Sequence, residues 1–263
     1  MSAASVISEE VARFDALGDN WWDPAGPMAP LHRINPLRIA WLRDAIAAHF
    51  RRSGDGPLEG LDILDIGCGA GLLAEPLSRL GAVVSGIDPA AGSIEVARAH
   101  AAATGADLTY RVGTVEDLAR EGAKFDVVLA MEVVEHVNDV PSFVASAASL
   151  VRPGGLIALS TLNRTLKSFA LAIVGAEYVL RWLPPGTHRW EQFVTPDELA
   201  AALRAAGLRV RRRQGMVYDP LRRERRHVVV AAFDNEPEFR ACMDSVRDEI
   251  KARRDRRCIH RSR

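Results

Sequence analysis

The chain has 263 residues, of which 48% are hydrophobic, and its 34 basic and 34 acidic side chains give a net charge of zero. Such a chain can bury the core of one α/β domain with extensions, or of two small domains at most. Zero net charge argues against nucleic acid as a partner, and three scattered cysteines indicate a reducing compartment without disulfides. The acidic N-terminus is unlike a secretory signal, and no apolar run is long enough to span a bilayer, so we expect a cytoplasmic protein.

The first 58 residues are expected to form a helical segment that covers a ligand site. Residues 6–17 are amphipathic, and Arg38–Phe50 repeats apolar residues at helical spacing. Trp21 and Trp22 lie between these stretches, and two tryptophans left in water would be costly. We therefore expect this segment to pack against the rest of the chain.

From residue 59 to 235, strand-like runs alternate with helix-like runs, which predicts a mostly parallel sheet covered by helices on both faces. Thr195 followed by Pro196 is a plausible helix start, and the short connection before the last strand favours an antiparallel hairpin. The expected strands are residues 61–66, 82–87, 108–112, 125–130, 156–161, 208–213 and 227–233, and the expected helices are Gly71–Leu80, Ala90–Thr104, Ser142–Val151 and Asp197–Ala206.

A glycine-rich turn, GCGAG, follows the first strand. Gly67 and Gly69 carry no Cβ, so the backbone can turn sharply and approach a ligand closely. The next helix points its free N–H groups at that ligand. Asp88 ends the second strand about 20 residues further on, where an acid accepts hydrogen bonds from both ribose hydroxyls. Together these features predict a nucleoside pocket.

The spacing of the glycines separates two kinds of nucleoside cofactor. A dinucleotide-binding domain has G-x-G-x-x-G and a second catalytic domain, whereas this chain has G-x-G-x-G and no such second domain. Both observations favour S-adenosylmethionine, which has no pyrophosphate to bind.

The segments DIGCGAG, Asp88, VEDL with Asp117, FDVVLAMEVVEHV and VRPGG resemble, in this order, the signature of class I methyltransferases. The resemblance implies a Rossmann-like α/β fold, with a seven-stranded, mostly parallel sheet, helices on both faces and an antiparallel last strand. It implies that Gly67 lies at the methionine part of the cofactor, Asp88 at the ribose and Asp117 at the adenine amino group, with Gly69 also binding the cofactor. For Asp117, capping of a helix is the alternative.

Three further segments resemble the ubiquinone biosynthesis O-methyltransferases: Pro30–Arg38, Met131–Val137 and Ser160–Leu199. This resemblance implies that Arg38 and Met131 contact the cofactor. An arginine can pair bidentately with the carboxylate of the methionine part, and a thioether can pack on the adenine or near the sulfonium. A surface arginine and a core methionine are the alternatives.

Glu132, Glu135 and His136 are spaced i, i+3 and i+4, so on a helical turn they share one face and can hold a divalent cation. The resemblance implies such a metal site, with Mg²⁺ the usual ion and Zn²⁺ also reasonable. Glu135 and His136 are also the catalytic candidates, because either a metal stabilises the phenolate of the substrate or His136 takes its proton. The alternative is that the carboxylates cap or solvate a short helix while His136 packs under it.

The segment 161–193 is expected to be an insertion that acts as a lid or a membrane contact. Its part Lys167–Pro184 is helical and apolar, with basic flanks that suit a helix lying on an anionic membrane surface. A lid packed over the pocket is the alternative, and one helix can serve both roles. Residues 236–263 are expected to form a helical basic tail that touches anionic lipid or is solvated. The apolar stripe of the insertion consists of Phe169, Ile173, Ala176 and Leu180.

We therefore expect an S-adenosylmethionine-dependent O-methyltransferase that acts on polyprenyl catechol and 3-demethylubiquinol, bound peripherally to the inner face of the membrane. The expected partners are the polyprenylated phenol, the anionic lipid surface and other proteins of ubiquinone biosynthesis. The nearest alternative is a methyltransferase for another phenolic or lipid small molecule. A non-catalytic cofactor-binding regulator and an NAD-dependent reductase are the rivals from other classes.

Overall fold

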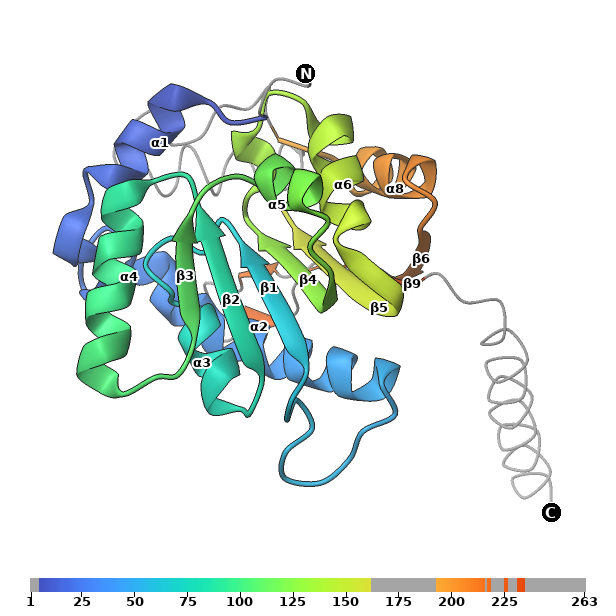
Figure 1. Cartoon of the computed structure of the whole chain (residues 1–263), viewed down its shortest axis with the longest axis horizontal. Helices are drawn as coiled ribbons and strands as arrows, with labels where there is room; N and C mark the ends of the chain where they lie inside the picture. The colour runs from blue at the N-terminus through green and yellow to red at the C-terminus, as the bar shows by residue number, and fades with distance from the viewer. Residues whose placement is uncertain (1–4, 162–192, 216, 219–224, 227–230, 235–263) are drawn as a thin grey trace, which may run out of the picture.

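The computed structural model describes residues 5–161, 193–215, 217–218, 225–226 and 231–234. Its centre is a seven-stranded sheet of order β3-β2-β1-β4-β5-β9-β6 (Figure 1). β1 to β5 pair in parallel, whereas β9 pairs antiparallel with both β5 and β6. The strands are β1 (Asp62–Ile66), β2 (Val83–Asp88), β3 (Thr109–Val112), β4 (Phe125–Met131), β5 (Val151–Ser160), β6 (Arg209–Arg212) and β9 (Ala231–Asp234), and β7 (Val217–Tyr218) pairs separately with β8 (Arg225–Arg226).

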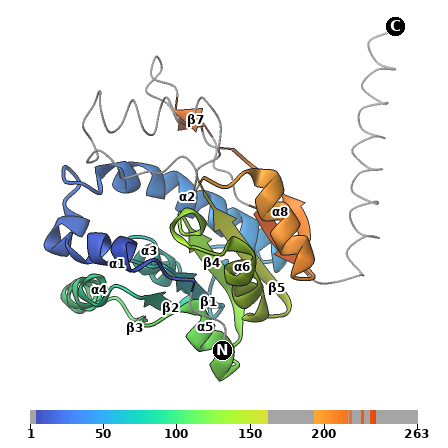
Figure 2. The ribbon, with the colours of Figure 1, turned by 90° about the horizontal axis from the view of Figure 1, so that it is seen from above.

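Helices cover both faces of this sheet (Figure 2). The helices are α1 (Ser8–Asp15), η1 (Gly18–Trp22), α2 (Ala29–His49), α3 (Ala74–Arg79), α4 (Ala91–Thr104), α5 (Val115–Glu121), η2 (Val134–His136), α6 (Val140–Ser149) and α8 (Pro196–Ala205). One core forms between the sheet and α2, α3 and α4, and a second forms between the sheet and α5, α6 and α8.

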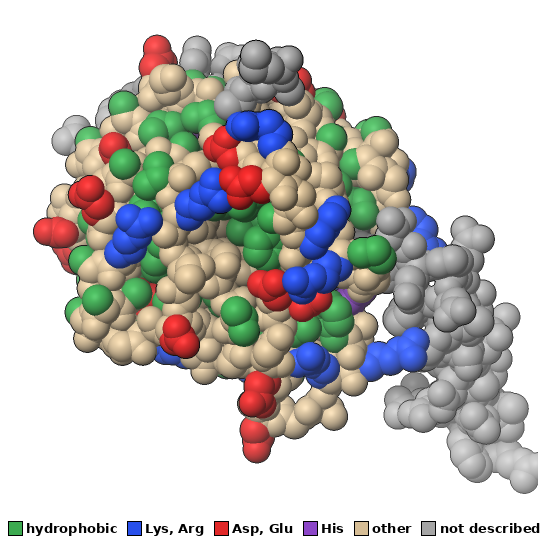
Figure 3. Space-filling view, in the orientation of Figure 1, with side chains coloured by type: hydrophobic (Ala, Val, Ile, Leu, Met, Phe, Trp, Pro, Cys, Tyr) green, Lys and Arg blue, Asp and Glu red, His purple; other side chains and the backbone are tan. Residues whose placement is uncertain are grey.

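Strand side chains alternate between these two cores. Along β5, Leu156 and Ala158 contribute to the first core, and Ile157 and Leu159 to the second. A parallel sheet with helices on both sides requires this pattern, because neither of its faces meets water. The predicted α/β class is therefore confirmed, and the outer surface carries basic and acidic side chains interspersed on the face that Figure 3 shows.

The strand order positions the ligand site. β1 lies between β2 and β4, so the chain proceeds outward from β1 in one direction and then returns to its other side. In such sheets, ligands bind at the carboxyl ends of the strands, at the point where this order reverses. The glycine-rich turn after β1 and Asp88 at the end of β2 both lie at this edge.

The structure differs from the sequence prediction in the bounds of some helices. The helix expected to begin at Arg38 begins at Ala29 and continues through Pro36, a residue that normally ends or kinks a helix. α5 was not among the expected helices, because seven residues are too short for clear periodicity. The Thr195 cap is confirmed: its side chain accepts a hydrogen bond from the Glu198 N–H.

The insertion is described only at its two ends, Thr161 and Phe193, and the expected membrane or lid helix lies outside the described residues. The basic tail 236–263 also lies outside them. Within the part of the chain that the structure describes, no helix is long and apolar enough to cross a membrane.

Candidate functional site

The glycine-rich turn and Asp88 are in direct contact. The Gly69 N–H donates to Asp88 Oδ2 over 2.9 Å, and the Ala90 N–H donates to Asp88 Oδ1 over 2.8 Å. The two backbone bonds fix the plane of this carboxylate at the carboxyl end of β2. Burial raises the pKa of Asp88, while these same hydrogen bonds oppose that rise. The predicted proximity of the turn and the acid is thus present in the structure.

The two glycines adopt left-handed backbone conformations, with φ of +67° at Gly67 and +52° at Gly69. A Cβ on Gly67 would lie 2.6 Å from a methyl carbon of Val133, and a Cβ on Gly69 would lie 2.5 Å from a ring carbon of Trp21. Glycine is therefore required for the turn itself and for close contact with protein side chains. The sequence prediction attributed this space to a ligand and did not foresee these protein neighbours.

Arg38 is buried in α2 at the same edge of the sheet, with 3% of its surface exposed. Its Nη1 donates to Asn35 Oδ1 and its Nη2 pairs with Glu132 Oε1, both over 3.2 Å. Arg38 Nε is buried and finds no acceptor among the described residues. The alternative of a surface arginine is therefore excluded, and the Nε–H of this guanidinium remains for a ligand.

Glu132 directly follows β4 and has a φ of +60°, a conformation that is uncommon for residues other than glycine. Its N–H donates to Ser160 Oγ over 3.0 Å, and the Ser160 hydroxyl donates to Glu132 Oε1 over 2.6 Å. Together with Arg38, Ser160 therefore holds this carboxylate at the carboxyl ends of β4 and β5. Sequence reasoning missed Ser160, although it is the first residue of the Ser160–Leu199 segment.

Asp65 is a second residue that the sequence analysis missed. It lies in β1, two residues before the turn, and only 2% of its surface is exposed. Burial raises its pKa to about 7, the Arg38 charge lowers it and the Asp88 charge raises it further. Asp65 Oδ2 has no hydrogen-bond donor among the described residues. Its position at the start of DIGCGAG was the available signal.

Asp117 takes part in the capping box at the N-terminus of α5. Asp117 Oδ2 accepts hydrogen bonds from the Thr114 N–H and hydroxyl, over 2.8 and 2.9 Å, and Oδ1 pairs with Arg120. This is the alternative that the sequence left open, and the adenine contact of Asp117 stays a prediction. Met131, the last residue of β4, is buried in the first core, so its cofactor contact also stays a prediction.

Glu132, Glu135 and His136 do not form the expected metal site. They were expected on one face of a helical turn, but Glu132 precedes the turn in a left-handed conformation and η2 is a short 3-10 helix. Within the described ranges, no three His, Cys, Asp or Glu side chains gather in a way that could hold a metal ion. The residues present therefore do not fit the predicted Mg²⁺ or Zn²⁺.

His136 instead pairs with α1. Its Nδ1 lies 2.9 Å from Glu10 Oε2, and its ring packs edge-on against Phe14 at 5.4 Å between centroids. A hydrogen on Nδ1 would face this carboxylate, and in that tautomer of the neutral ring Nε2 would hold the lone pair. Glu135 is buried beside it, and burial together with the Glu132 charge raises the pKa of Glu135 to about 7.

Comparison with known proteins agrees with this geometry. Residues 36–212 match a methyltransferase domain family. The chain is 59% identical over 223 residues to the ubiquinone biosynthesis O-methyltransferase of Azorhizobium caulinodans, covering 84% of this chain and 88% of that protein. It is also 59% identical over 225 residues to the protein of the same name from Methylocella silvestris, covering 83% and 88%.

The fold has counterparts among solved structures. Magnesium protoporphyrin IX methyltransferase from Synechocystis, solved with bound SAH, superposes with a TM-score of 0.61 and covers 86% of this chain and 99% of that one. At 22% sequence identity this match shows the fold alone. Taken with the relatives, the turn, the acid and the buried arginine lead to one assignment. The chain belongs to the ubiquinone biosynthesis O-methyltransferases, which are S-adenosylmethionine-dependent enzymes with the class I methyltransferase fold.

Proposed function

We propose that this chain transfers the methyl group of S-adenosylmethionine to a phenolic hydroxyl of polyprenyl catechol and of 3-demethylubiquinol. The observation that carries the proposal is the 2.9 Å hydrogen bond from the Gly69 N–H to Asp88 Oδ2. It places a fixed carboxylate beside the turn at the carboxyl ends of β1 and β2, where a ribose can be bound. The acceptor follows from the names of the relatives.

Two buried groups near the turn support binding of the methionine part of the donor. Arg38 Nε is a hydrogen-bond donor and Asp65 Oδ2 is an acceptor, and neither has a partner among the described residues. A buried polar group without a partner is costly, so a ligand that satisfies both groups is strongly favoured. The carboxylate and ammonium of methionine have the complementary character. Gly67, Asp117 and Met131 remain proposed contacts of the same donor.

Methyl transfer from a sulfonium is an in-line displacement, so the protein has to position the acceptor and remove its proton. We assign proton removal to His136, whose Nδ1 is held by Glu10 so that Nε2 can accept. The phenolic oxygen then attacks the methyl carbon, the C–S bond breaks, its electron pair remains on sulfur and the proton ends on Nε2. Glu135 lies adjacent, where its carboxylate can stabilise the imidazolium.

The polyprenyl tail of the acceptor supports a position at the membrane surface. A substrate of this kind resides in lipid, and the apolar Lys167–Pro184 stretch with its basic flanks suits an interfacial helix. We therefore propose peripheral association with the inner face of the membrane, through anionic lipid, and contact with other proteins of the pathway. We also propose that the chain has three parts: an N-terminal helical segment, 1–58, a methyltransferase domain, 59–235, and a C-terminal basic tail, 236–263.

The donor site is tested by Asp88→Asn. We expect a rise of at least about tenfold in the dissociation constant for S-adenosylhomocysteine in calorimetry, because one acceptor for the ribose is lost. Asp55→Asn, in an exposed loop, is the matched control and keeps the wild-type value. A short-tail polyprenyl catechol with labelled donor then reports methylation. Methylation of unrelated phenols at equal rates would favour the alternative function.

The assigned base is tested by His136→Gln. General-base catalysis contributes about 10²–10⁴ in rate, so kcat falls by that factor while donor binding is retained. His49→Gln is the control, because this histidine bonds the Gly154 carbonyl at the opposite edge of the sheet. Wild-type kcat in His136→Gln would remove this residue from the mechanism.

Glu135→Gln tests the buried carboxyl through the pH dependence of stability. Its pKa is about 7 in the folded chain and 4.5 ordinarily, so its contribution to stability is present at low pH and is lost as the pH rises through 7. Glutamine mimics the protonated form. The variant is therefore expected to be more stable than wild type at pH 8, by up to about 3 kcal/mol, and close to wild type at pH 5. If the variant and the wild type had the same melting temperature at pH 8 as well as at pH 5, the raised pKa of Glu135 would be contradicted.

The interfacial helix is tested by cosedimentation with anionic liposomes. Phe169→Ser combined with Ile173→Ser removes two residues of the apolar stripe, so pelleting is expected to be lost while donor binding is kept. Leu171→Ser combined with Val174→Ser makes a similar change off the stripe and is the matched control. Equal pelleting of the stripe variant and wild type would refute the interfacial role.

A further inference from the structure

The N-terminal strap, defined here as residues Ser8–Trp22 (α1 and η1), packs against α4 on the side of the sheet where the glycine-rich turn lies (Figure 2). Near its middle, Asp15 Oδ1 accepts a hydrogen bond of 2.7 Å from the Gly92 N–H in the first turn of α4. Its Glu10 and Phe14 contact His136 beyond β4. The strap therefore contacts both α4, which follows β2, and η2, which follows β4.

Trp21, near the end of the strap, packs on the glycine-rich turn. Only 6% of its surface is exposed. Its ring is so close to Gly69 that a Cβ on this glycine would lie 2.5 Å from a ring carbon of Trp21. The ring of Phe14 stacks on it with centroids 6.0 Å apart. Gly69 therefore contacts two groups: its Cα faces the Trp21 ring, and its N–H donates to the Asp88 carboxylate that is proposed to bind the ribose.

The indole N–H of Trp21 has no acceptor among the residues that the structure describes, although the atom is buried. The adjacent Trp22 differs, because its Nε1 donates to the Ala70 carbonyl over 3.1 Å. A buried tryptophan N–H normally finds a partner, and leaving it without one costs stability. Its position against the donor-binding turn indicates that the missing acceptor belongs to the ligand.

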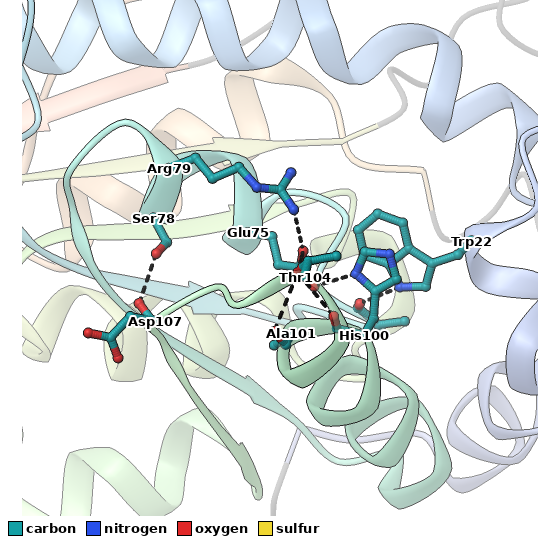
Figure 4. Close-up of polar contacts among 9 residues, drawn as sticks. Trp22, Glu75, Ser78, Arg79, His100, Ala101, Thr104 and Asp107 are labelled. Atoms are coloured by element: carbon teal, nitrogen blue, oxygen red, sulfur yellow. Dashed lines mark hydrogen bonds and ion pairs between the residues drawn. The ribbon is translucent and has the colours of Figure 1, made fainter.

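A group of contacts around the neighbouring Trp22 fixes this position (Figure 4). The Trp22 and His100 rings stack with centroids 3.5 Å apart and planes 4° apart. His100 Nδ1 lies 2.7 Å from Glu75 Oε1, and the second oxygen of this fully buried carboxylate receives Arg79 and Thr104. Because every oxygen of Glu75 is bonded, His100 is held in one orientation, and Trp22 and the neighbouring Trp21 are held with it.

We propose that Trp21 is a further donor-binding residue, whose indole N–H donates to an oxygen atom of bound S-adenosylmethionine, and that the Trp22–His100 stack is the positioning contact that keeps it there. The donor offers such acceptors in its ribose hydroxyls and its carboxylate. This inference rests on the proposed function, because it requires the donor to occupy the site beside Gly69 and Asp88.

Trp21→Phe tests the inference, since it keeps an aromatic ring and removes the N–H. Calorimetry with S-adenosylhomocysteine is expected to show binding weakened about threefold to tenfold, the effect of one lost hydrogen bond. Without ligand, the variant is expected to melt somewhat lower than wild type, because the smaller ring leaves a cavity against Gly69 and Phe14, so the affinity for S-adenosylhomocysteine is the deciding measurement. Trp41→Phe is the matched control: its N–H donates to Gln214 over 3.0 Å, and its loss leaves the affinity for the donor unchanged.

These measurements distinguish failure of the Trp21 contact from failure of the donor site. Unchanged affinity in Trp21→Phe, with wild-type binding intact, overturns only the role of Trp21. Absence of any heat from the wild-type protein overturns the donor site itself and the inference with it.

Discussion

The contact between the Asp88 carboxylate and the backbone of the glycine-rich turn is the interaction on which the donor site depends. Two N–H groups, from Gly69 and Ala90, hold the carboxylate at 2.9 and 2.8 Å. They tie the end of β2 to the turn after β1, at the point where the strand order reverses. Since this carboxylate is partly buried, the hydrogen bonds also offset part of the cost of its charge.

Burial of charge extends from this contact across the edge of the sheet. Arg38, Asp65 and Glu135 each expose 3% of their surface or less, and burial raises the pKa of both carboxyls to about 7. Such groups are costly to a fold unless they have partners. Their concentration at the carboxyl ends of β1 and β4 is therefore what a site for a charged ligand requires, and perturbed pKa values of this kind are typical of functional sites.

The strap completes the site from a distant part of the sequence. Glu10 orients His136, and Trp21 covers the glycine-rich turn, so the proposed base and the proposed donor contact share one covering element. The stack of Trp22 on His100, supported by the buried Glu75, anchors this element to α4. The proposed base and the proposed donor site are therefore both contacted by the N-terminal strap, which precedes the sheet in the chain.

Local pattern in the sequence determined the alternating α/β order, the turn after β1, the acid at the end of β2 and the Thr195 cap, because each depends on residues close together in the chain. Only the tertiary structure decided which groups meet. The pairing of Arg38 with Glu132, of Glu10 with His136 and of Trp21 with Gly69 joins residues far apart in the chain. The expected metal site is likewise not assembled among the described residues: i, i+3, i+4 spacing implies a shared face only in a regular helix, and the left-handed Glu132 and the short 3-10 helix η2 do not provide one.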